Sequence, residues 1–546
     1  MSRRLAMYDV RGIQDYIYKT AKVQDAIGAS AIVEDIISEA LKDAVEKEEL
    51  SYDLEWYDEN GVLPYDVSKA SDTDVQVLYI GGGNAFVSFQ DEDICQRVNH
   101  RMSRYVLEKT YSLQLAIAVT DQTKNYAKDY KNIFDEMVRV KANMEVSKPF
   151  GALPVMDVEI KTGLPACPVE KKDGDKAIGT SRETYLKKAK EDQVRDLIQR
   201  AKIFDNYVES KGVDSTLAVV HIDGNNMGLR IRKLIDGIED YGEAVNKMRE
   251  ISYCINHSYK SVYEQMENQF NRYAGKGDGK KQYNVLKILT AGDDITYVCK
   301  GKYALSTVEY FCGEIGKKTM NGGKNEKDIY LYGFSVCAGV AYIGSHFPFS
   351  VGYEVAEACC DSAKDMAKKP ENMLPVDKAG NPITNMDGVE KSSVSYKIGN
   401  WVDFQICKNI HTGDLDKTRK LEYVTSHNEK LLIRPYELPL LKLKSRESAI
   451  NKYENLKCNI RYFQNDKKIP HSHAKKLRNL YSSGQEVVNE FAAFLASRGW
   501  KMPDGTVNMY TEDNQALWYD ALELFDCFEE ANVEKIQKEE TGHGDL

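Results

Sequence analysis

The chain has 546 residues, with 74 Lys and Arg against 84 Asp and Glu, and its formal net charge is −10. This length exceeds what one hydrophobic core supports and is typical of three or four domains. The acidic balance argues against a protein that coats nucleic acid. An anionic substrate would therefore need a local basic pocket and metal ions.

The 11 cysteines include no CxxC pair, and most of them lie within apolar runs. This pattern predicts reduced, buried thiols in a cytoplasmic protein, with neither disulfides nor a zinc site. No signal peptide and no long apolar run occurs, so we expect neither secretion nor a membrane span.

Residues 1–125 predict a first domain that begins with a strand ending at Asp9. Gly12 then leads into a helix with an apolar face formed by Ile32, Val33, Ile36, Ile37 and Leu41. Four segments follow: an acidic, exposed loop over 51–74, a hairpin over 75–89, a helix over 91–109 and a strand over 113–120. This order is that of a ferredoxin-like βαββαβ unit.

The tip of the first hairpin is formed by Gly81, Gly82, Gly83 and Asn84. Glycines there can bring backbone N–H groups against a phosphate or a base, and they can equally permit a tight turn without a ligand. The sequence leaves both interpretations open. Because this tip has no carboxylate, we do not expect it to bind metal ions.

Residues 126–215 are mostly polar and predict a helical linker domain, interrupted by two stretches that contain Gly and Pro. Cys167 is the only cysteine of this segment, so we predict no zinc site in it.

Two stretches carry the acidic residues on which the functional interpretation depends: LAVVHIDGNNMG over 217–228 and NVLKILTAGDDITYVC over 284–299. In each, a run of aliphatic and β-branched residues ends in carboxylates, as a buried strand does when it carries a catalytic side chain to its rim. The second stretch predicts a hairpin in which Gly292 permits the turn and Asp293 and Asp294 lie at the tip.

If Asp223 lies on the strand next to this hairpin, three carboxylates converge on a volume that suits Mg²⁺ ions and a nucleoside triphosphate. An Asp-rich turn alone is more often a solvated β-turn. The turn together with a strand that ends in DGNNMG favours the metal site.

A helix should follow this strand, with a first turn formed by Asn225, Asn226, Met227 and Gly228. The free N–H groups and the dipole of such a helix start suit a triphosphate. The order of elements in the first domain recurs from Leu217 to about Lys369, with a helix over 303–318, a strand over 330–343 and a last helix over 351–368. We therefore expect a second ferredoxin-like domain over 216–400.

Residues 393–407 read as one or two further strands, and amphipathic helices begin at about Pro435. They predict a mainly helical C-terminal domain over 401–546.

The motifs HIDGNNMG and AGDD, followed by FSVCAGVAYIGSHFPF and EVAEACCDSAK, resemble the second palm domain of the large polymerase-like subunit of type III CRISPR effector complexes. The first domain resembles the first palm of that family through RGIQDYIY, the IGAS helix and the YIGGGN turn. The family patterns are DxDxxG and GGDD, and this chain departs from them at Asn225 and Ala291. No His-Asp dipeptide occurs, so we expect no nuclease domain of the family's kind and no DNA cleavage.

The resemblance implies an α+β fold with two palm domains, a helical segment between them and a C-terminal helical domain. It implies that the catalytic carboxylates are Asp223, Asp293 and Asp294, which with Ile222 form the metal site for Mg²⁺ or Mn²⁺. The implied nucleotide contacts are Gly224, Asn225, Asn226, Met227, Gly228, Gly292, Lys364, Gly81, Gly82, Gly83 and Asn84. A Lys such as Lys364 near a helix C-terminus also complements the helix dipole, and both roles stay open.

The predicted function is a metal-dependent nucleotidyltransferase of the cyclase class, which converts ATP or another triphosphate into a cyclic oligonucleotide messenger in CRISPR-like or antiphage defence. One metal would activate a ribose 3′-hydroxyl and the other would neutralise the triphosphate. The expected partners are RNA-binding subunits with a guide RNA, and the two palms could also face each other across a homodimer.

The alternative is a scaffold subunit that senses nucleotide or RNA without turnover, which Asn225 and Ala291 favour. A template-dependent polymerase is a third option, although the sequence shows no template-binding element.

Overall fold

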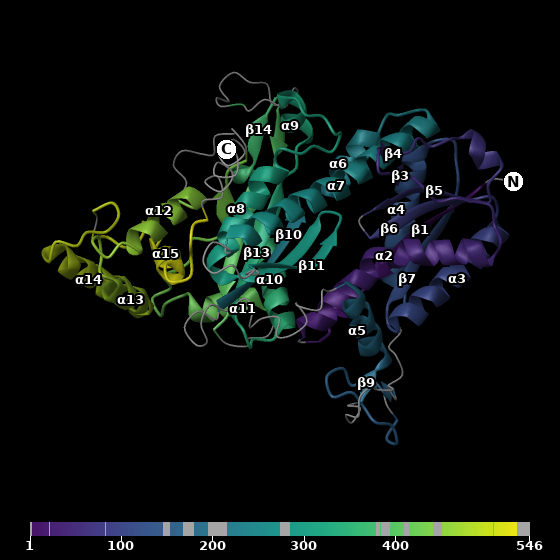
Figure 1. Ribbon diagram of the computed structural model, residues 1–546. Helices are drawn as coiled ribbons and strands as arrows, with labels where there is room; N and C mark the ends of the chain where they lie inside the picture. Colours follow the sequence, from purple (N-terminus) through teal and green to yellow (C-terminus); the bar gives the residue numbers. More distant parts are fainter. Residues whose placement is uncertain are drawn as a thin grey trace, which may run out of the picture.

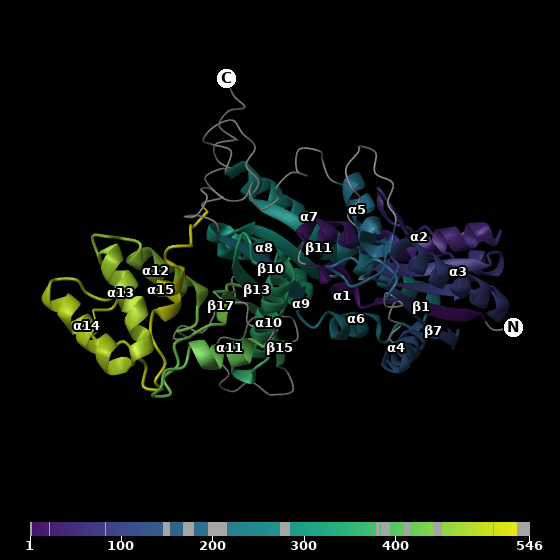
Figure 2. The ribbon, with the colours of Figure 1, turned by 90° about the horizontal axis from the view of Figure 1, so that it is seen from below.

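The computed structural model describes residues 3–20, 22–81, 83–145, 153–167, 179–194, 216–273, 284–377, 383, 394–408, 414–440, 450–505 and 507–531 (Figure 1). Two large sheets form the body of the molecule, and a lobe of helices lies beyond the second sheet, far from the first (Figures 1 and 2). The α+β class predicted from the sequence is confirmed.

The first sheet has the strand order β2-β5-β6-β1-β7. Its strands are β1 (Arg4–Arg11), β2 (Tyr52–Asp53), β5 (Val75–Gly81), β6 (Asn84–Phe89) and β7 (Gln114–Asp121). Its helices are α1 (Ile13–Tyr18), α2 (Val23–Lys47) and α3 (Glu92–Thr110). Strand β1 pairs antiparallel with both β6 and β7, which is the arrangement of a ferredoxin-like unit.

The alternation of side chains along β1 explains how its two faces are covered. Tyr8 and its same-face neighbours pack with α2 and α3, whereas Leu5 and Met7 face α4 (Tyr126–Asn143) and α7 (Tyr241–Tyr273). Both faces are buried, so the first sheet is a central layer.

The second sheet has the strand order β11-β12-β10-β13-β16-β17. Its strands are β10 (Thr216–Gly224), β11 (Val285–Ala291), β12 (Asp294–Lys300), β13 (Val336–Gly344), β16 (Asn400–Ile406) and β17 (Tyr436–Leu438). Its helices are α6 (Met227–Ile235), α7, α8 (Ala304–Ile315), α9 (Glu326–Tyr332) and α10 (Phe349–Ala367). The first four strands in this order repeat the ferredoxin-like arrangement, as predicted.

Helix α7 connects the two sheets. Its 33 residues span about 50 Å, and its side chains pack on β5 of the first sheet and on β11 of the second. The fully buried Arg249 on α7 donates hydrogen bonds to the carbonyl oxygens of Leu78 (2.8 Å), Val77 (2.6 Å) and Leu63 (2.9 Å). One helix therefore sets the position of the first hairpin relative to the second sheet.

The remaining elements lie around this body. Short strand pairs are β3 (Tyr57–Asp58) with β4 (Gly61–Val62), β8 (Ala166–Cys167) with β9 (Thr180–Ser181), and β14 (Leu374–Val376) with β15 (Ser395–Lys397). The other helices are α5 (Arg182–Val194), α11 (Leu415–Glu422), α12 (Tyr453–Phe463), α13 (His471–Leu480), α14 (Gln485–Ser497) and α15 (Tyr519–Leu524). Among the described helices, none is long and apolar enough to cross a membrane.

Three local predictions were wrong. The segment predicted as a strand over 330–343 begins as helix α9, and β13 starts only at Val336. Tyr436–Leu438, which the amphipathic pattern placed in a helix, is an edge strand of the second sheet. Trp56, in the loop predicted to be exposed, is buried. In each case packing against a distant element overrides the local pattern.

The second sheet continues beyond residue 400 into β16 and β17, which lie next to β13. The predicted division into residues 1–125, 126–215, 216–400 and 401–546 stays a prediction. We propose that the second domain extends to about residue 440 instead, because a sheet folds as one cooperative layer.

Candidate functional site

Asp223 and Asp294 lie side by side where β10 and β12 end. The last pair of the β10–β12 register is Ile222 with Ile295, and one further step places Asp223 beside Asp294. Directly opposed residues on antiparallel strands point to the same face of a sheet. Both carboxylates therefore belong to the face that α10 covers.

Helix α10 brings a basic partner to this pair. Lys364 Nζ donates a hydrogen bond to Asp223 Oδ2 and lies 3.5 Å from Asp361 Oδ1. The side chains of Lys364 and Asp223 are 20% and 29% exposed, so the ion pair is half-buried. Lys364, which the resemblance assigned to the triphosphate, contacts a predicted metal ligand in this structure.

Asp293 lies in the turn between β11 and β12, packed against the backbone of Gly224. A Cβ atom added to Gly224 would lie 2.7 Å from Asp293 Oδ2 and 2.9 Å from the hydroxyl of Tyr259. Gly292 has a φ of 64°, which favours glycine and allows the turn that delivers Asp293. The two glycines predicted at the site thus have a steric and a conformational role.

Burial and the neighbouring carboxylates raise the pKa values of Asp293 and Asp294. Burial, and secondarily the charge of Asp223, raises the pKa of Asp293 to about 7. Burial together with Asp223 and Asp293 raises the pKa of Asp294 well above its ordinary value. His221 Nδ1 lies 3.4 Å from Asp294 Oδ1, but burial lowers the His221 pKa to about 4, so the ring is neutral at pH 7. The cluster of three carboxylates therefore has too little positive charge beside it to balance its negative charge.

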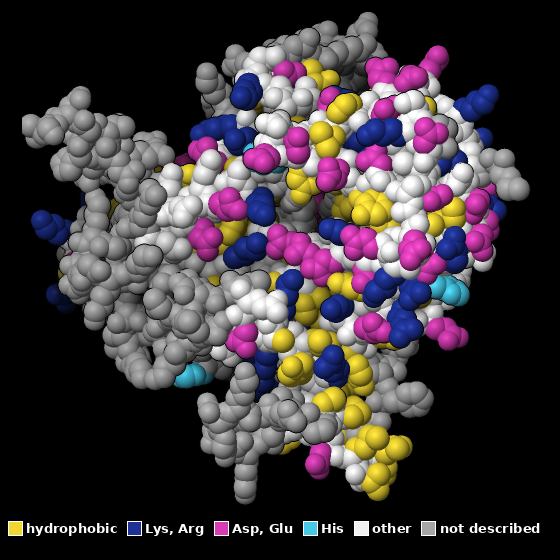
Figure 3. Space-filling view, turned by 45° about the vertical axis from the view of Figure 1, so that its right-hand side comes forward, with side chains coloured by type: hydrophobic (Ala, Val, Ile, Leu, Met, Phe, Trp, Pro, Cys, Tyr) yellow, Lys and Arg dark blue, Asp and Glu magenta, His cyan; other side chains and the backbone are white. Residues whose placement is uncertain are grey.

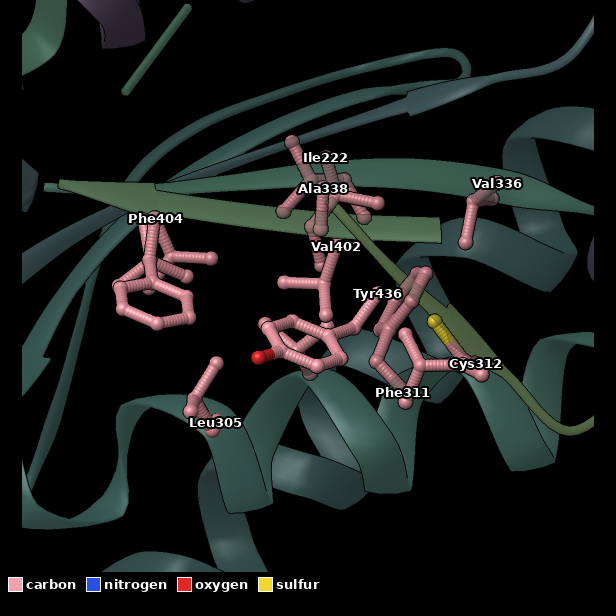
Figure 4. Close-up of a cluster of buried hydrophobic side chains, with 14 of the residues drawn as sticks. Ile222, Leu305, Phe311, Cys312, Val336, Ala338, Val402, Phe404 and Tyr436 are labelled. Atoms are coloured by element: carbon pink, nitrogen blue, oxygen red, sulfur yellow. The ribbon is translucent and has the colours of Figure 1, made fainter. Parts of the chain in front are cut away.

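Ile222, predicted as part of the metal site, points away from it. Its side chain is fully buried in the core beneath the second sheet, in a cluster with Ala338, Val402 and Phe311 (Figure 4). Only the backbone carbonyl of Ile222 remains as an oxygen that could contribute to a metal site.

Carboxylate and carbonyl oxygens are the ligands that Mg²⁺ and Mn²⁺ prefer, so the donor set fits these ions. The unpaired Oδ1 of Asp294 and the mutual repulsion of the carboxylates agree with that fit. Among the described residues, however, no group of three or more His, Cys, Asp or Glu side chains is close enough to hold a metal ion. The donor atoms are therefore of the kind that binds Mg²⁺ or Mn²⁺, but the described side chains are not close enough together to coordinate an ion in this structure.

The two hairpin tips meet at one cavity of about 620 Å³. Gly81, Gly83 and Asn84 of the first sheet line it together with Gly292, Asp293 and Asp294 of the second. The space-filling view shows a hollow on one face of the molecule, in which acidic side chains gather with Lys and Arg beside them (Figure 3). A single chain therefore brings the predicted glycine-rich turn and the predicted acidic turn together.

Three polar atoms of the cavity lining lack a hydrogen-bond partner within the described parts of the chain: Asn84 Oδ1, Thr290 Oγ1 and Asp294 Oδ1. Buried polar atoms are rarely left unpaired in folded proteins, and each one costs about 1–3 kcal/mol. Their gathering at one cavity is what a polar ligand site requires.

The first turn of the predicted nucleotide helix does not reach this cavity. Helix α6 starts at Met227, two residues later than expected, because Asn226 has a left-handed φ of 54°. Asn225 is buried, and its Nδ2 donates to the Gly399 carbonyl oxygen at 3.0 Å. Gly228 and Met227 are not among the lining residues either. Gly82 lies outside the described residues.

Several cavity residues were missed by the sequence reasoning. They are Asp15 on α1, Glu34 and Asp35 on α2, Trp56 and Tyr57 in the loop before β5, and Asn256 and Lys260 on α7. The Trp-Tyr pair within the acidic loop over 51–74 was the one available signal for them. The helical residues gave no signal, because charged positions on a helix normally face solvent.

The chain is thus an α+β protein with two ferredoxin-like units that share one polar cavity. Solved structures similar to it are those of the Csm1 subunit of type III-A CRISPR-Csm complexes, the family that the sequence motifs also resemble. The Csm1–Csm4 cassette in complex with pppApA has a TM-score of 0.48 and 14% identity, with 97% of this chain and 70% of that chain covered.

Two further solved structures are similar to the chain to about the same degree. The Csm1–Csm4 subcomplex of the type III-A interference complex has a TM-score of 0.46 and 14% identity, covering 96% and 69% of the two chains. Csm1 in T. onnurineus has a TM-score of 0.44 and 15% identity, covering 98% and 69%. No protein-family model matches the sequence, and no curated protein matches it significantly.

Proposed function

We propose that the chain is a nucleotidyltransferase of the cyclase class, which joins ribonucleoside triphosphates into a cyclic oligonucleotide. The observation that carries this proposal is the meeting of a glycine-rich turn and an acidic turn at a single cavity of about 620 Å³. A donor triphosphate at the acidic turn and an acceptor at the glycine-rich turn would share that space. The volume lies in the range of small-molecule sites.

In the proposed reaction, the 3′-oxygen of the acceptor ribose attacks the α-phosphorus of the donor. A new O–P bond forms, the bond to the β-phosphate breaks, pyrophosphate leaves, and the proton of the hydroxyl passes to solvent. Asp223, Asp293, Asp294 and the Ile222 carbonyl would hold Mg²⁺ or Mn²⁺. When bound, these ions lower the pKa of the attacking hydroxyl and neutralise the triphosphate.

The residues of the chain itself hold the substrates in place. Gly81 and Gly83 can offer backbone N–H groups to a phosphate or ribose because no side chain blocks the approach. Gly292 positions the acidic turn, and Asn84 has an unpaired oxygen for a hydroxyl. Lys364 neutralises Asp223 and is retained as a proposed phosphate contact. Pre-orientation of this kind supplies a large part of the rate in phosphoryl transfer.

We further propose a role in a cytoplasmic, CRISPR-like antiviral system, together with RNA-binding subunits and a guide RNA. The similar solved structures carry AMPPNP, ATP, pppApA or cA4, and several contain Csm4, which makes ATP the first substrate to test. All 11 cysteines are free thiols and six of them are buried, as expected in a reducing compartment.

A second candidate is a subunit that binds nucleotide without turnover. Two observations favour it. Lys364 donates a hydrogen bond to Asp223, and the described carboxylates do not lie close enough together to hold a metal ion. Asn225 replaces the second Asp of the family pattern. Its side chain donates hydrogen bonds to Ser335 and Gly399 in the protein interior and does not line the cavity. Nucleotide binding without product would support this candidate.

The test incubates the purified chain with each radiolabelled ribonucleoside triphosphate and Mg²⁺ or Mn²⁺, and resolves the products by mass. Asp293→Asn/Asp294→Asn should lower product formation by about 10³-fold or more, because the site loses most of its affinity for the cations. The matched control is Glu512→Gln/Asp513→Asn, an acidic pair on an exposed turn far along the chain. Equal activity of the two double variants would refute the proposal.

A further inference from the structure

One part of the cavity wall is aromatic. Trp56 and Tyr57, from the loop before β5, both line the cavity. Their rings lie 4.7 Å apart in an edge-on arrangement, and Trp56 is only 5% exposed. Tyr57 differs, because 51% of its surface is exposed. A buried Trp thus fixes a Tyr whose ring remains available to a ligand.

Helix α7 supports this Tyr from behind. The ring of Tyr57 lies 5.9 Å from that of Tyr253, which stacks on His257 at 5.4 Å with an angle of 5° between the rings. Tyr253 and His257 are one helical turn apart, so the two stacked rings share one face of α7. The position of Tyr57 is therefore set by two elements and not by its loop alone.

The same face of α7 continues along the cavity. Asn256 and Lys260, one turn apart, both line it, and Lys260 Nζ lies 3.8 Å from Glu34 Oε1 of α2. From Tyr253 to Lys260 the helix rises about 10 Å, which is comparable to the length of a nucleoside monophosphate. An aromatic ring, an amide and a cation are thus arranged in order along one wall.

Two of these groups, the aromatic ring and the amide, match the base of a nucleotide. A Tyr ring stacks on any base, and the stacking is worth about 1–3 kcal/mol per base by alanine substitution. A side-chain amide can both donate to and accept from the edge of a base. The acidic and glycine-rich turns at the same cavity suit the phosphates and ribose, as described above, but carry no aromatic side chain on which a base could stack.

We propose that Trp56, Tyr57 and Asn256 form the base-binding subsite of the cavity, with Tyr57 as the stacking surface for the base of a ribonucleoside triphosphate. This inference rests on the proposed function and adds the recognition of the base to it. Trp56 positions Tyr57, and Asn256 meets the base edge. The triphosphate is directed away from Tyr57, towards the turn that carries Asp293 and Asp294.

The test compares two probes by calorimetry in the presence of Mg²⁺: ATP, which has a base, and inorganic tripolyphosphate, which does not. Tyr57→Ala should weaken ATP binding about ten-fold and leave tripolyphosphate binding unchanged. Tyr57→Phe, which keeps the ring, should bind ATP as the parent does. Tyr52→Ala is the matched control, because Tyr52 is an exposed Tyr on the nearby strand β2 that does not line the cavity.

The outcomes separate the two proposals. If the parent chain binds ATP and Tyr57→Ala binds it equally well, the subsite is refuted and the proposed function is untouched. If Tyr57→Ala weakens ATP and tripolyphosphate equally, the residue supports the cavity as a whole and the subsite is again refuted. If the parent chain binds neither probe, the proposed function fails, and the subsite fails with it.

A second measurement addresses Asn256. The relative affinities of ATP, GTP, CTP and UTP should differ in the parent chain, because an amide pairs differently with each base edge. Asn256→Ala should compress these differences several-fold without changing the affinity for tripolyphosphate. An unchanged ranking of the four nucleotides would remove Asn256 from the subsite.

Discussion

Gly224 determines how closely Asp293 can approach the end of β10. A methyl group at this position would meet Asp293 Oδ2, Met227 Cγ and the Tyr259 hydroxyl at 2.7–2.9 Å, which is shorter than real Cβ contacts. We expect Gly224→Ala to displace the Asp293 carboxylate and to lower nucleotidyl transfer at least ten-fold. The cost in free energy of unfolding should be about 1–3 kcal/mol, as for other overpacked sites.

The control for this prediction is Gly228→Ala. An added Cβ on Gly228 has no neighbour within 4 Å, and Ala is a better helix former than Gly. Product formation and thermal unfolding should be measured on both variants. If Gly228→Ala loses as much activity as Gly224→Ala, the effect belongs to the start of α6 and not to the position of Asp293.

At the scale of elements, Arg249 is the side chain of α7 that hydrogen-bonds to the first hairpin strand. The guanidinium of Arg249 donates hydrogen bonds to three backbone carbonyl oxygens. We expect Arg249→Met to lower the free energy of unfolding by about 2–4 kcal/mol, because three carbonyl oxygens lose charge-assisted hydrogen bonds. Urea unfolding measures this change.

The neighbouring exposed residue Glu250 provides the control, and Glu250→Gln should unfold as the parent does. Nucleotide binding should also weaken in Arg249→Met, since Val77 and Leu78 lie on the strand that leads to the Gly81 turn. If Arg249→Met lowers the free energy of unfolding but binds ATP as tightly as the parent does, α7 supports the fold but does not position the cavity.

For the whole molecule, the important finding is that both hairpin turns line one cavity within a single chain. Two inactive variants, one altered at the glycine-rich turn (Gly83→Val) and one at the acidic turn (Asp293→Asn/Asp294→Asn), should therefore not restore activity when mixed. Gly83 has a φ of 78°, which a β-branched residue tolerates poorly. Product per chain should also be independent of protein concentration.

Restored activity in the mixture would instead place the reaction between two chains. A homodimer with one donor turn and one acceptor turn from different copies would regain up to about a quarter of its sites by random pairing. That result would contradict the arrangement within one chain and would support the homodimer that the sequence left open.

Most elements of the fold were predictable because their patterns are local. Continuous apolar runs identify β1 and β10, and the 3.6-residue period identifies α2, α3 and α10. The repeat of the same order along the chain then predicts two ferredoxin-like units. The strand Tyr436–Leu438 and the helix Glu326–Tyr332 were mistaken, since three to seven residues carry too little periodicity to outweigh a distant partner.

The sequence by itself determined the acidic and glycine-rich turns, because carboxylates at the end of an apolar run and consecutive glycines are visible in any single stretch. Only the tertiary structure decided which of these residues meet. The pairing of Lys364 with Asp223 joins positions 141 residues apart, and the contact of Tyr57 with Tyr253 joins a loop to a helix. The side chain of Asn225 does not line the cavity, because it donates a hydrogen bond to the backbone carbonyl oxygen of Gly399. Such contacts depend on how sheets and helices pack, and the free energy of packing is shared among many distant residues, so no local pattern reports it.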